Sequence, residues 1–269
     1  MRYAFILFIA LFISSCEESN DKKIPAEKKS SVKSERIEEN TVTVEENFTW
    51  NYYAGTVGLY EEEVILELSF SGDSIFGGYW YLKHGKKLTL TGKASPKSNQ
   101  INLTESYKGK TTGKFVLINQ EDSLVGSWVA PNNSATAQNV HLKRVLKDQE
   151  SPFKPKFEKF VWEHEISIYN YNGEDEQSIV REMAEDDMNL VKIGDFVLFN
   201  YTVIGSNAHV GYISGLAPLK GKKAIYKGEK PCELSIEFVN EKTIKTDEDD
   251  CSYYRGMRAY FQGELKKVK

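Results

Sequence analysis

Apolar side chains recur at every second position through much of the stretch from Trp50 to Leu146. Val64, Leu66, Leu68 and Phe70 form one such run, with less apolar neighbours between them. A period of two places such side chains on one face of an extended strand, because successive residues point to opposite faces. Turn residues separate the runs, so the pattern predicts about eight short strands joined by hairpins, as in an up-and-down barrel or a sandwich.

A second β segment follows a charged, proline-containing stretch. Its first strand should carry Phe160 to Ile168 on one face, and its last should run from Met257 to Leu265. The only helix that the sequence favours covers Glu174 to Asp187, where Ile179 and Met183 are four residues apart. The predicted fold is therefore all-β, with two antiparallel meander barrels or sandwiches and one short helix in the second.

The chain divides by composition into five parts. We expect a signal peptide over 1–15, a lipidated and disordered tether over 16–47, an eight-stranded β domain over 48–147, a linker over 148–157 and a second β domain with a disulfide over 158–269.

The N-terminus resembles a bacterial lipoprotein signal. Arg2 precedes an apolar run of about eleven residues, which is shorter than the roughly 20 that a membrane-spanning helix needs. The run ends in Ile13-Ser14-Ser15-Cys16, which has the aliphatic, small, small, cysteine order of a lipobox. The resemblance implies cleavage before Cys16, attachment of lipid to its thiol, and a place on the outer membrane facing the periplasm or the cell surface. An ordinary cleavable signal is the alternative.

Three cysteines are present, and Cys16 is the expected lipidation site. The two others, Cys232 and Cys251, lie in a chain that we expect to be exported, where disulfides form. A metal or redox pair is the rival interpretation, but no histidine lies near them to complete a zinc site. We therefore predict a disulfide and no metal.

Charge and motifs exclude several functions. The formal charge of −4 becomes −5 once Arg2 leaves with the signal, which argues against binding to nucleic acid. Gly72-Asp73-Ser74-Ile75 resembles the block of a secreted esterase family, but the Asp-Ser pair recurs at Asp122-Ser123 in the same kind of turn. Nucleophile elbows, phosphate loops and dinucleotide fingerprints are missing from the sequence. We expect no enzyme and no cofactor.

Glu105 is the first candidate site residue. It follows Ile101 and Leu103 on the same strand face, so an interior face would carry a carboxylate near the barrel mouth. A buried charge needs a partner, which Lys110 or Lys114 could supply. The alternatives are a structural ion pair and a polar anchor for a ligand.

Four other residues complete the candidate ligand-binding set. Tyr79 and Tyr81 share a strand face, and Trp128 occupies the strand that echoes theirs. His164 lies on the apolar strand face between Trp162 and Ile166, where it is either a buried core residue or a ligand-binding group. Aromatic side chains at such positions either fill a barrel, form a seam between domains or mark a binding surface.

Two families share features with this chain. Phe76-Gly77-Gly78-Tyr79-Trp80-Tyr81, Leu88-Thr89-Leu90-Thr91-Gly92 and Leu124-Val125-Gly126-Ser127-Trp128 resemble the secreted calycin barrels, which are avidin-like or lipocalin-like. The resemblance implies an eight-stranded meander whose interior holds a small apolar ligand. The stretch from Cys232 to Leu265 is similar in style to periplasmic lysozyme inhibitors, which are small disulfide-pinned barrels.

The leading hypothesis is a non-catalytic envelope lipoprotein that binds a small ligand, a glycan or a protein. Inhibition of a lysozyme-like hydrolase comes second, a hydrolase third, and a purely structural envelope role completes the alternatives. Whether the barrel interiors are hollow or packed with side chains distinguishes between the binding roles. A hollow interior would favour a small ligand, whereas packed interiors in both domains would favour surface recognition of a protein or glycan.

Overall fold

The computed structural model describes residues 48–58, 62–95, 97–131, 133–171 and 177–268. The predicted signal peptide over 1–15, the lipidation site Cys16 and the tether over 16–47 lie outside these ranges. The predicted all-β fold is confirmed, because the described chain forms two closed antiparallel barrels of eight strands each. In the ranges given above, no helix has the length and apolar character needed to cross a membrane.

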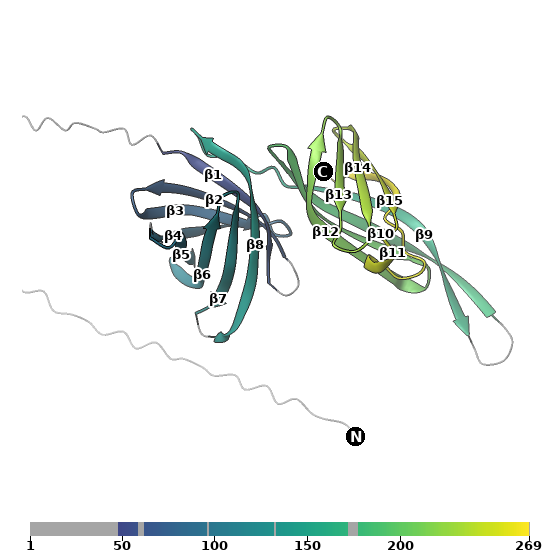
Figure 1. Ribbon diagram of the computed structural model, residues 1–269. Helices are drawn as coiled ribbons and strands as arrows, with labels where there is room; N and C mark the ends of the chain where they lie inside the picture. Colours follow the sequence, from purple (N-terminus) through teal and green to yellow (C-terminus); the bar gives the residue numbers. More distant parts are fainter. Residues whose placement is uncertain (1–47, 59–61, 96, 132, 172–176, 269) are drawn as a thin grey trace, which may run out of the picture. The chain divides into compact units, whose positions relative to one another are not determined.

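Barrel 1 is an up-and-down meander in which each strand pairs with its neighbour in the sequence and β8 returns to β1 (Figure 1). The predicted turn echo is also present, since Asp73 and Asp122 each immediately precede a strand. The strands are β1 (Trp50–Val57), β2 (Glu62–Ser71), β3 (Ser74–Tyr81), β4 (Lys87–Ser95), β5 (Gln100–Tyr107), β6 (Lys110–Gln120), β7 (Ser123–Ala130) and β8 (Asn133–Gln149).

Side chains from all eight strands fill the interior of barrel 1. Alternation along each strand turns one set inward, and the inward set forms a single buried cluster. Tyr53, Tyr79 and Phe115 are the bulkiest members, and each is at most 1% exposed. A core packed in this way excludes solvent from the barrel axis.

Barrel 2 has the same meander order, closed by pairing of its first and last strands. Its interior is also packed, with contributions from every strand and from Ala259 and Phe261 in the loop before the last one. The strands are β9 (Glu158–Tyr171), β10 (Gln177–Ile193), β11 (Phe196–Gly205), β12 (His209–Lys220), β13 (Lys223–Lys227), β14 (Glu233–Asn240), β15 (Thr243–Asp249) and β16 (Gly263–Lys267).

The predicted helix over Glu174–Asp187 is wrong for its described part, which is a strand from Gln177 onward, and residues 174–176 lie outside the described ranges. Residues from Gln177 onward belong to β10, which pairs with β9 from Gln177 to Leu190. The outer half of this pair extends beyond the other strands of the barrel as a two-stranded ribbon (Figure 1), because β11 joins β10 only from Asp187 onward. Ile179 and Met183 do share a face, but it is an exposed strand face.

The predicted last strand was too long at its start. Residues 257–262 form an irregular loop, and β16 begins only at Gly263. Phe261 and Ala259 are nevertheless buried as the alternation required, whereas Met257 is 79% exposed. The backbone N–H of Phe261 donates to a carboxylate oxygen of Glu248, and this side-chain bond takes the place of a ladder bond.

The stretch between β8 and β9 has no strand pairing but is not a free linker. The backbone N–H of Phe153 donates to the hydroxyl of Tyr52, and the two rings pack edge to face. Residues 46–269 form one compact unit, in which a third buried cluster contains residues from both barrels, and Phe153 and Phe157 of this stretch pack against it. Trp80 belongs to this third cluster, which gives it a packing role.

Candidate functional site

The structure brings four of the five predicted ligand-binding residues together at one end of barrel 1. The carboxylate of Glu105 is 3% exposed and accepts hydrogen bonds from the hydroxyl of Tyr79 at 2.6 Å and from the indole N–H of Trp128 at 2.7 Å. Thr112 donates a further bond. Tyr79 in turn contacts the hydroxyl of Tyr81 at 3.3 Å. The predicted interior face of this strand is therefore correct.

A glycine makes this arrangement possible. Gly113 lies opposite Glu105 in the β5–β6 register, and a Cβ atom on it would come within 2.2 Å of the indole nitrogen of Trp128. Any other residue at 113 would therefore displace the indole from the carboxylate. This close approach is a reason for glycine in the middle of a strand.

The expected lysine partner of Glu105 is absent. Within the described chain, neither Lys110 nor Lys114 forms an ion pair with it, and both side chains are exposed. The carboxylate is instead solvated by neutral hydroxyl and indole donors, which satisfy a buried charge without a second desolvation penalty. Burial and the nearby oxygens raise the pKa of the Tyr79 hydroxyl, so it stays a donor. The side-chain donors around Glu105 thus satisfy its carboxylate from within the barrel.

His164, the fifth predicted residue, lies in barrel 2 and borders a cavity of about 280 Å³. Its ring stacks on Trp162, two residues earlier on the same strand face, with the ring centres 4.4 Å apart. Nε2 lies 3.1 Å from the Oδ1 atom of Asp186, which is ion-pair range. Nε2 is buried and makes no hydrogen bond of regular geometry among the described residues, so the carboxylate of Asp186 acts on it as a charged neighbour.

Asp186 comes from β10, opposite Trp162 in the register, and is 1% exposed. Burial raises the pKa of its carboxyl, while the backbone N–H of Ile204, which donates at 2.7 Å, and the neighbouring His164 act in the opposite direction. An acid and a base with incomplete hydrogen bonding thus lie side by side in a cavity wall. Such a pair typifies functional sites, although structural pairs occur as well.

The rim of this cavity carries polar and aromatic groups from three parts of barrel 2. The ribbon supplies Glu165, and the end of β11 supplies Gly205 followed by Ser206. The loop before β16 supplies Arg258, Tyr260 and Gln262. Tyr260 is 53% exposed, so one aromatic face is available to solvent.

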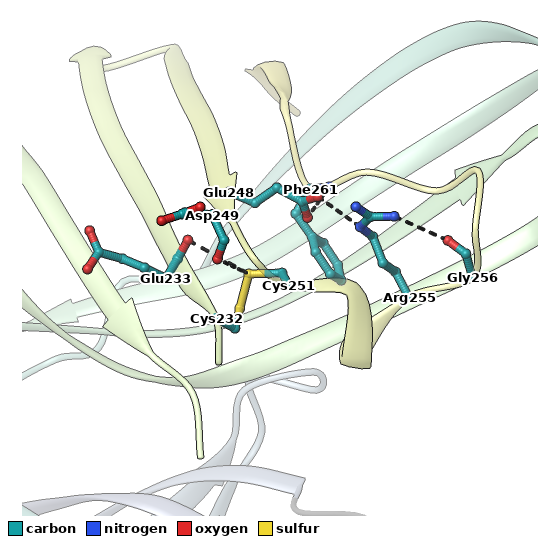
Figure 2. A network of polar contacts seen from close by, with 8 residues as sticks. All are labelled: Cys232, Glu233, Glu248, Asp249, Cys251, Arg255, Gly256 and Phe261. Atoms are coloured by element: carbon teal, nitrogen blue, oxygen red, sulfur yellow. Dashed lines mark hydrogen bonds and ion pairs between the residues drawn. A yellow bond between two sulfur atoms is a disulfide. The ribbon is translucent and has the colours of Figure 1, made fainter. Parts of the chain in front are cut away.

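The predicted disulfide is confirmed, because Cys232 and Cys251 are joined in the structure (Figure 2). It links the residue before β14 to the start of the loop that carries the cavity rim. In the same loop Arg255 donates to Glu248 at 2.8 Å, and the guanidinium of Arg255 lies over the ring of Tyr260. These contacts fix the loop that presents Arg258 and Tyr260.

Sequence reasoning did not identify Glu63, Glu67 or Asp186 as buried carboxylates. Glu63 lies in β2, is 4% exposed and accepts hydrogen bonds from Asn200 at 3.0 Å and from Tyr212 at 3.2 Å. Burial raises the pKa of this carboxyl. A cavity of about 390 Å³ adjoins it, and Tyr81 lines the same cavity. The run of three glutamates gave no signal for this, because only pairing with the rest of the fold distinguishes Glu63 from Glu62.

No cluster of three or more His, Cys, Asp or Glu side chains suited to a metal ion occurs in the described ranges. The esterase-like serine, Ser74, lies at an exposed turn, where it contacts Asp73 and where Asp73 pairs with Lys93. Comparison of the chain with protein-family models, curated proteins and solved structures finds no match in any of the three.

Proposed function

We propose that this chain is a non-catalytic, lipid-anchored envelope protein that recognises a partner through the surface of barrel 2. The lipobox-like sequence ending at Cys16 supports the anchor and the outer-membrane location. A meander of eight strands, as the calycin resemblance implies, supports relationship to those secreted barrels. The fold and the sequence motifs give no support to nucleic-acid binding.

We favour recognition by the outer surface because the interiors of both barrels are packed with side chains. Each interior is filled by one buried cluster with side chains from all eight strands. Calycin-type ligand binding needs a cavity on the barrel axis, and small-molecule sites generally occupy about 300 to 1,000 Å³. A packed axis leaves the outer surface and the barrel ends for recognition.

The cavity beside His164 is the surface that we propose for this role, and a glycan is the partner that it suits. It combines an exposed tyrosine ring with the planar polar groups of Arg258 and Gln262. It also holds the buried imidazole of His164, whose Nε2 lies 3.1 Å from the carboxylate of Asp186. Stacking on rings and hydrogen bonds from rigid polar groups are how proteins bind polar ligands with many hydroxyl groups.

Binding to purified peptidoglycan and to envelope polysaccharide tests this proposal. The mature chain carrying Cys16→Ala should bind one of them, and Arg258→Ala or Gln262→Ala should weaken binding about tenfold, because each removes a hydrogen bond to the ligand worth about 1 to 2 kcal/mol. Lys110→Ala on barrel 1 is the control. Equal binding by all of these variants would contradict the assignment of the cavity.

The anchor has its own test. Labelling of cells that express the full chain with radioactive palmitate should label the wild-type protein and not Cys16→Ala. Absence of label on the wild type would contradict a lipidated cysteine.

The ribbon favours the second candidate function, inhibition of a lysozyme-like hydrolase. An inhibitor needs a projecting segment that reaches into a substrate cleft, and the outer halves of β9 and β10 form one (Figure 1). A lysozyme assay with the purified chain decides: inhibition that Met183→Glu abolishes would favour this role, and full enzyme activity at a large excess of the chain would exclude it.

A further inference from the structure

Barrel 2 carries three apolar side chains on its outer face where β12 and β13 meet. Alternation turns Ala217 and Ala224 into the core and places Leu216, Pro218 and Ile225 on the outer face, where the half-buried Leu216 also packs against the third buried cluster. These three form the floor of a groove with a volume of about 560 Å³. Three lysines border the groove: Lys220, Lys223 and Lys227.

The groove exists because the ladder between these two strands ends early. The register pairs Lys220 with Lys223 and Leu219 with Ala224, and in the described chain it goes no further. The N–H of Leu219 donates to Asp195, on the β11 side. Consecutive residues of a strand point their N–H groups in opposite directions. The nitrogen of Pro218 therefore faces β13, and it has no hydrogen to donate. The paired residues of β12 and β13 therefore end at Leu219 in the described chain.

The mouth of the groove has unbalanced positive charge. Lys220 and Lys223 lie directly opposite each other, and like charges at such positions destabilise a sheet. Neither forms an ion pair within the described residues, although Glu237 is the neighbour of Lys223 on β14. Lys227 alone is paired, with Glu233 at 3.4 Å. An anion bound here would relieve the repulsion between the two unpaired ammonium groups.

We propose that this groove binds a long-chain carboxylate, with its acyl chain over Leu216, Pro218 and Ile225 and its head group between Lys220 and Lys223. The apolar floor suits a hydrocarbon chain, because burying it removes apolar surface from water. The volume lies within the range of small-molecule sites. The groove is separate from the cavity beside His164 and shares no lining residue with it.

Calorimetric titration with dodecanoate, below the concentration at which it forms micelles, tests this site. The mature chain carrying Cys16→Ala should bind one equivalent, and should bind dodecanol and dodecyltrimethylammonium at least tenfold more weakly, because they lack the negative charge. The double variant Lys220→Glu/Lys223→Glu should weaken dodecanoate binding about tenfold or more. Lys110→Glu/Lys114→Glu makes the same charge change on exposed lysines of barrel 1 and should leave the affinity unchanged.

A second variant tests the floor of the groove. Ile225→Asn keeps both lysines and should weaken dodecanoate binding while leaving the binding of acetate, which lacks the chain, as weak as before. The proposal is overturned if the three dodecyl compounds bind equally, if the lysine variants do not differ from their control, or if the chain binds anionic vesicles but not dodecanoate.

Discussion

At each of its eight junctions barrel 1 pairs seven or eight residues of neighbouring strands. Barrel 2, over the same described chain, pairs only two residues between β12 and β13 and two between β16 and β9. Both barrels have the same strand number and meander order, so the comparison isolates how a barrel is closed. In barrel 1 backbone pairing is extensive at every junction between strands, whereas in barrel 2 two junctions have only two paired residues each.

Side chains strengthen barrel 2 near these junctions. The loop that starts at Cys251 covers the edge of β12 that β13 leaves unpaired, where the N–H of Gly256 donates to the carbonyl of Val210. The disulfide and the Arg255–Glu248 pair hold this loop in place (Figure 2). At the other junction an ion pair joins Lys267 of β16 to Glu158 of β9. Covalent and ionic contacts therefore replace missing ladder bonds.

Removal of the disulfide should have the largest effect. Cys232→Ser combined with Cys251→Ser releases a loop whose ends are 19 residues apart. We expect a loss of about 3 kcal/mol from the free energy of unfolding of barrel 2, by the chain-entropy model. Urea denaturation measures this loss. Unchanged stability after reduction would show that the loop is held without the covalent bond.

Removal of the Arg255–Glu248 ion pair should lower the free energy of unfolding somewhat less than removal of the disulfide. Arg255→Met leaves Glu248, which is mostly buried, without its charged partner, and should lower the free energy of unfolding by about 2 kcal/mol. The matched control is Lys245→Met, which removes an exposed ion pair with Glu264 and should cost about 0.5 kcal/mol or less. Equal losses of stability in the two variants would contradict a special stabilising role of Arg255.

Barrel 1 should respond to a change in its polar core without any effect on barrel 2. Trp128→Phe removes the indole donor to Glu105 and should cost about 1.5 kcal/mol, because a hydrogen bond to a buried charge is lost. Amide hydrogen exchange followed by mass spectrometry should show faster exchange in β5, β6 and β7. Tyr107→Phe, at an exposed site, is the control. Faster exchange confined to β9–β16 would contradict the assignment of the Trp128–Glu105 hydrogen bond to the core of barrel 1.

Acid should open the β16–β9 junction first. Burial raises the pKa of Glu158, but hydrogen bonds from Lys267 and Lys156 outweigh it, so the pKa lies below the ordinary 4.5. The unfolded chain therefore takes up this proton at a higher pH than the folded one. The stabilising contribution is present above pH 4.5 and is lost as the pH falls through the lowered pKa.

The size of the acid effect should be below about 1 kcal/mol, since the pair is partly solvated. Exchange at the amides of β16, measured as a function of pH, should rise at low pH in the wild-type protein and be nearly independent of pH in Glu158→Gln. The same acid dependence in both proteins would assign the effect to another group.

The two-residue period of apolar residues predicted most of the strands of the two barrels and most of their inward-facing side chains. It placed Glu105 on an interior face, turned Phe261 and Leu265 inward and ended strands at the observed turns, because burial of one face is a local property of the sequence. The disulfide prediction rested on the number of cysteines and on the compartment that we expect for the chain. Partners of a buried group were harder: Glu105 accepts from Trp128, and this pairing depends on strand register and on Gly113.

The helix prediction failed for a reason that the sequence itself contains. A spacing of four residues, as between Ile179 and Met183, fits one face of a helix and also one face of a strand, because four is even. The surrounding Glu, Arg, Met and Ala residues favour a helix by intrinsic propensity. Pairing with β9 along the whole ribbon outweighs this preference, and periodicity alone cannot detect such pairing.

Native-state hydrogen exchange of the oxidised and the reduced protein tests the difference in closure most directly. The account predicts that reduction of the Cys232–Cys251 bond accelerates amide exchange in β12 to β16 and leaves β2 to β7 unchanged. Equal acceleration in both barrels, or none in either, would contradict the conclusion that side chains close barrel 2 where its backbone ladder is short.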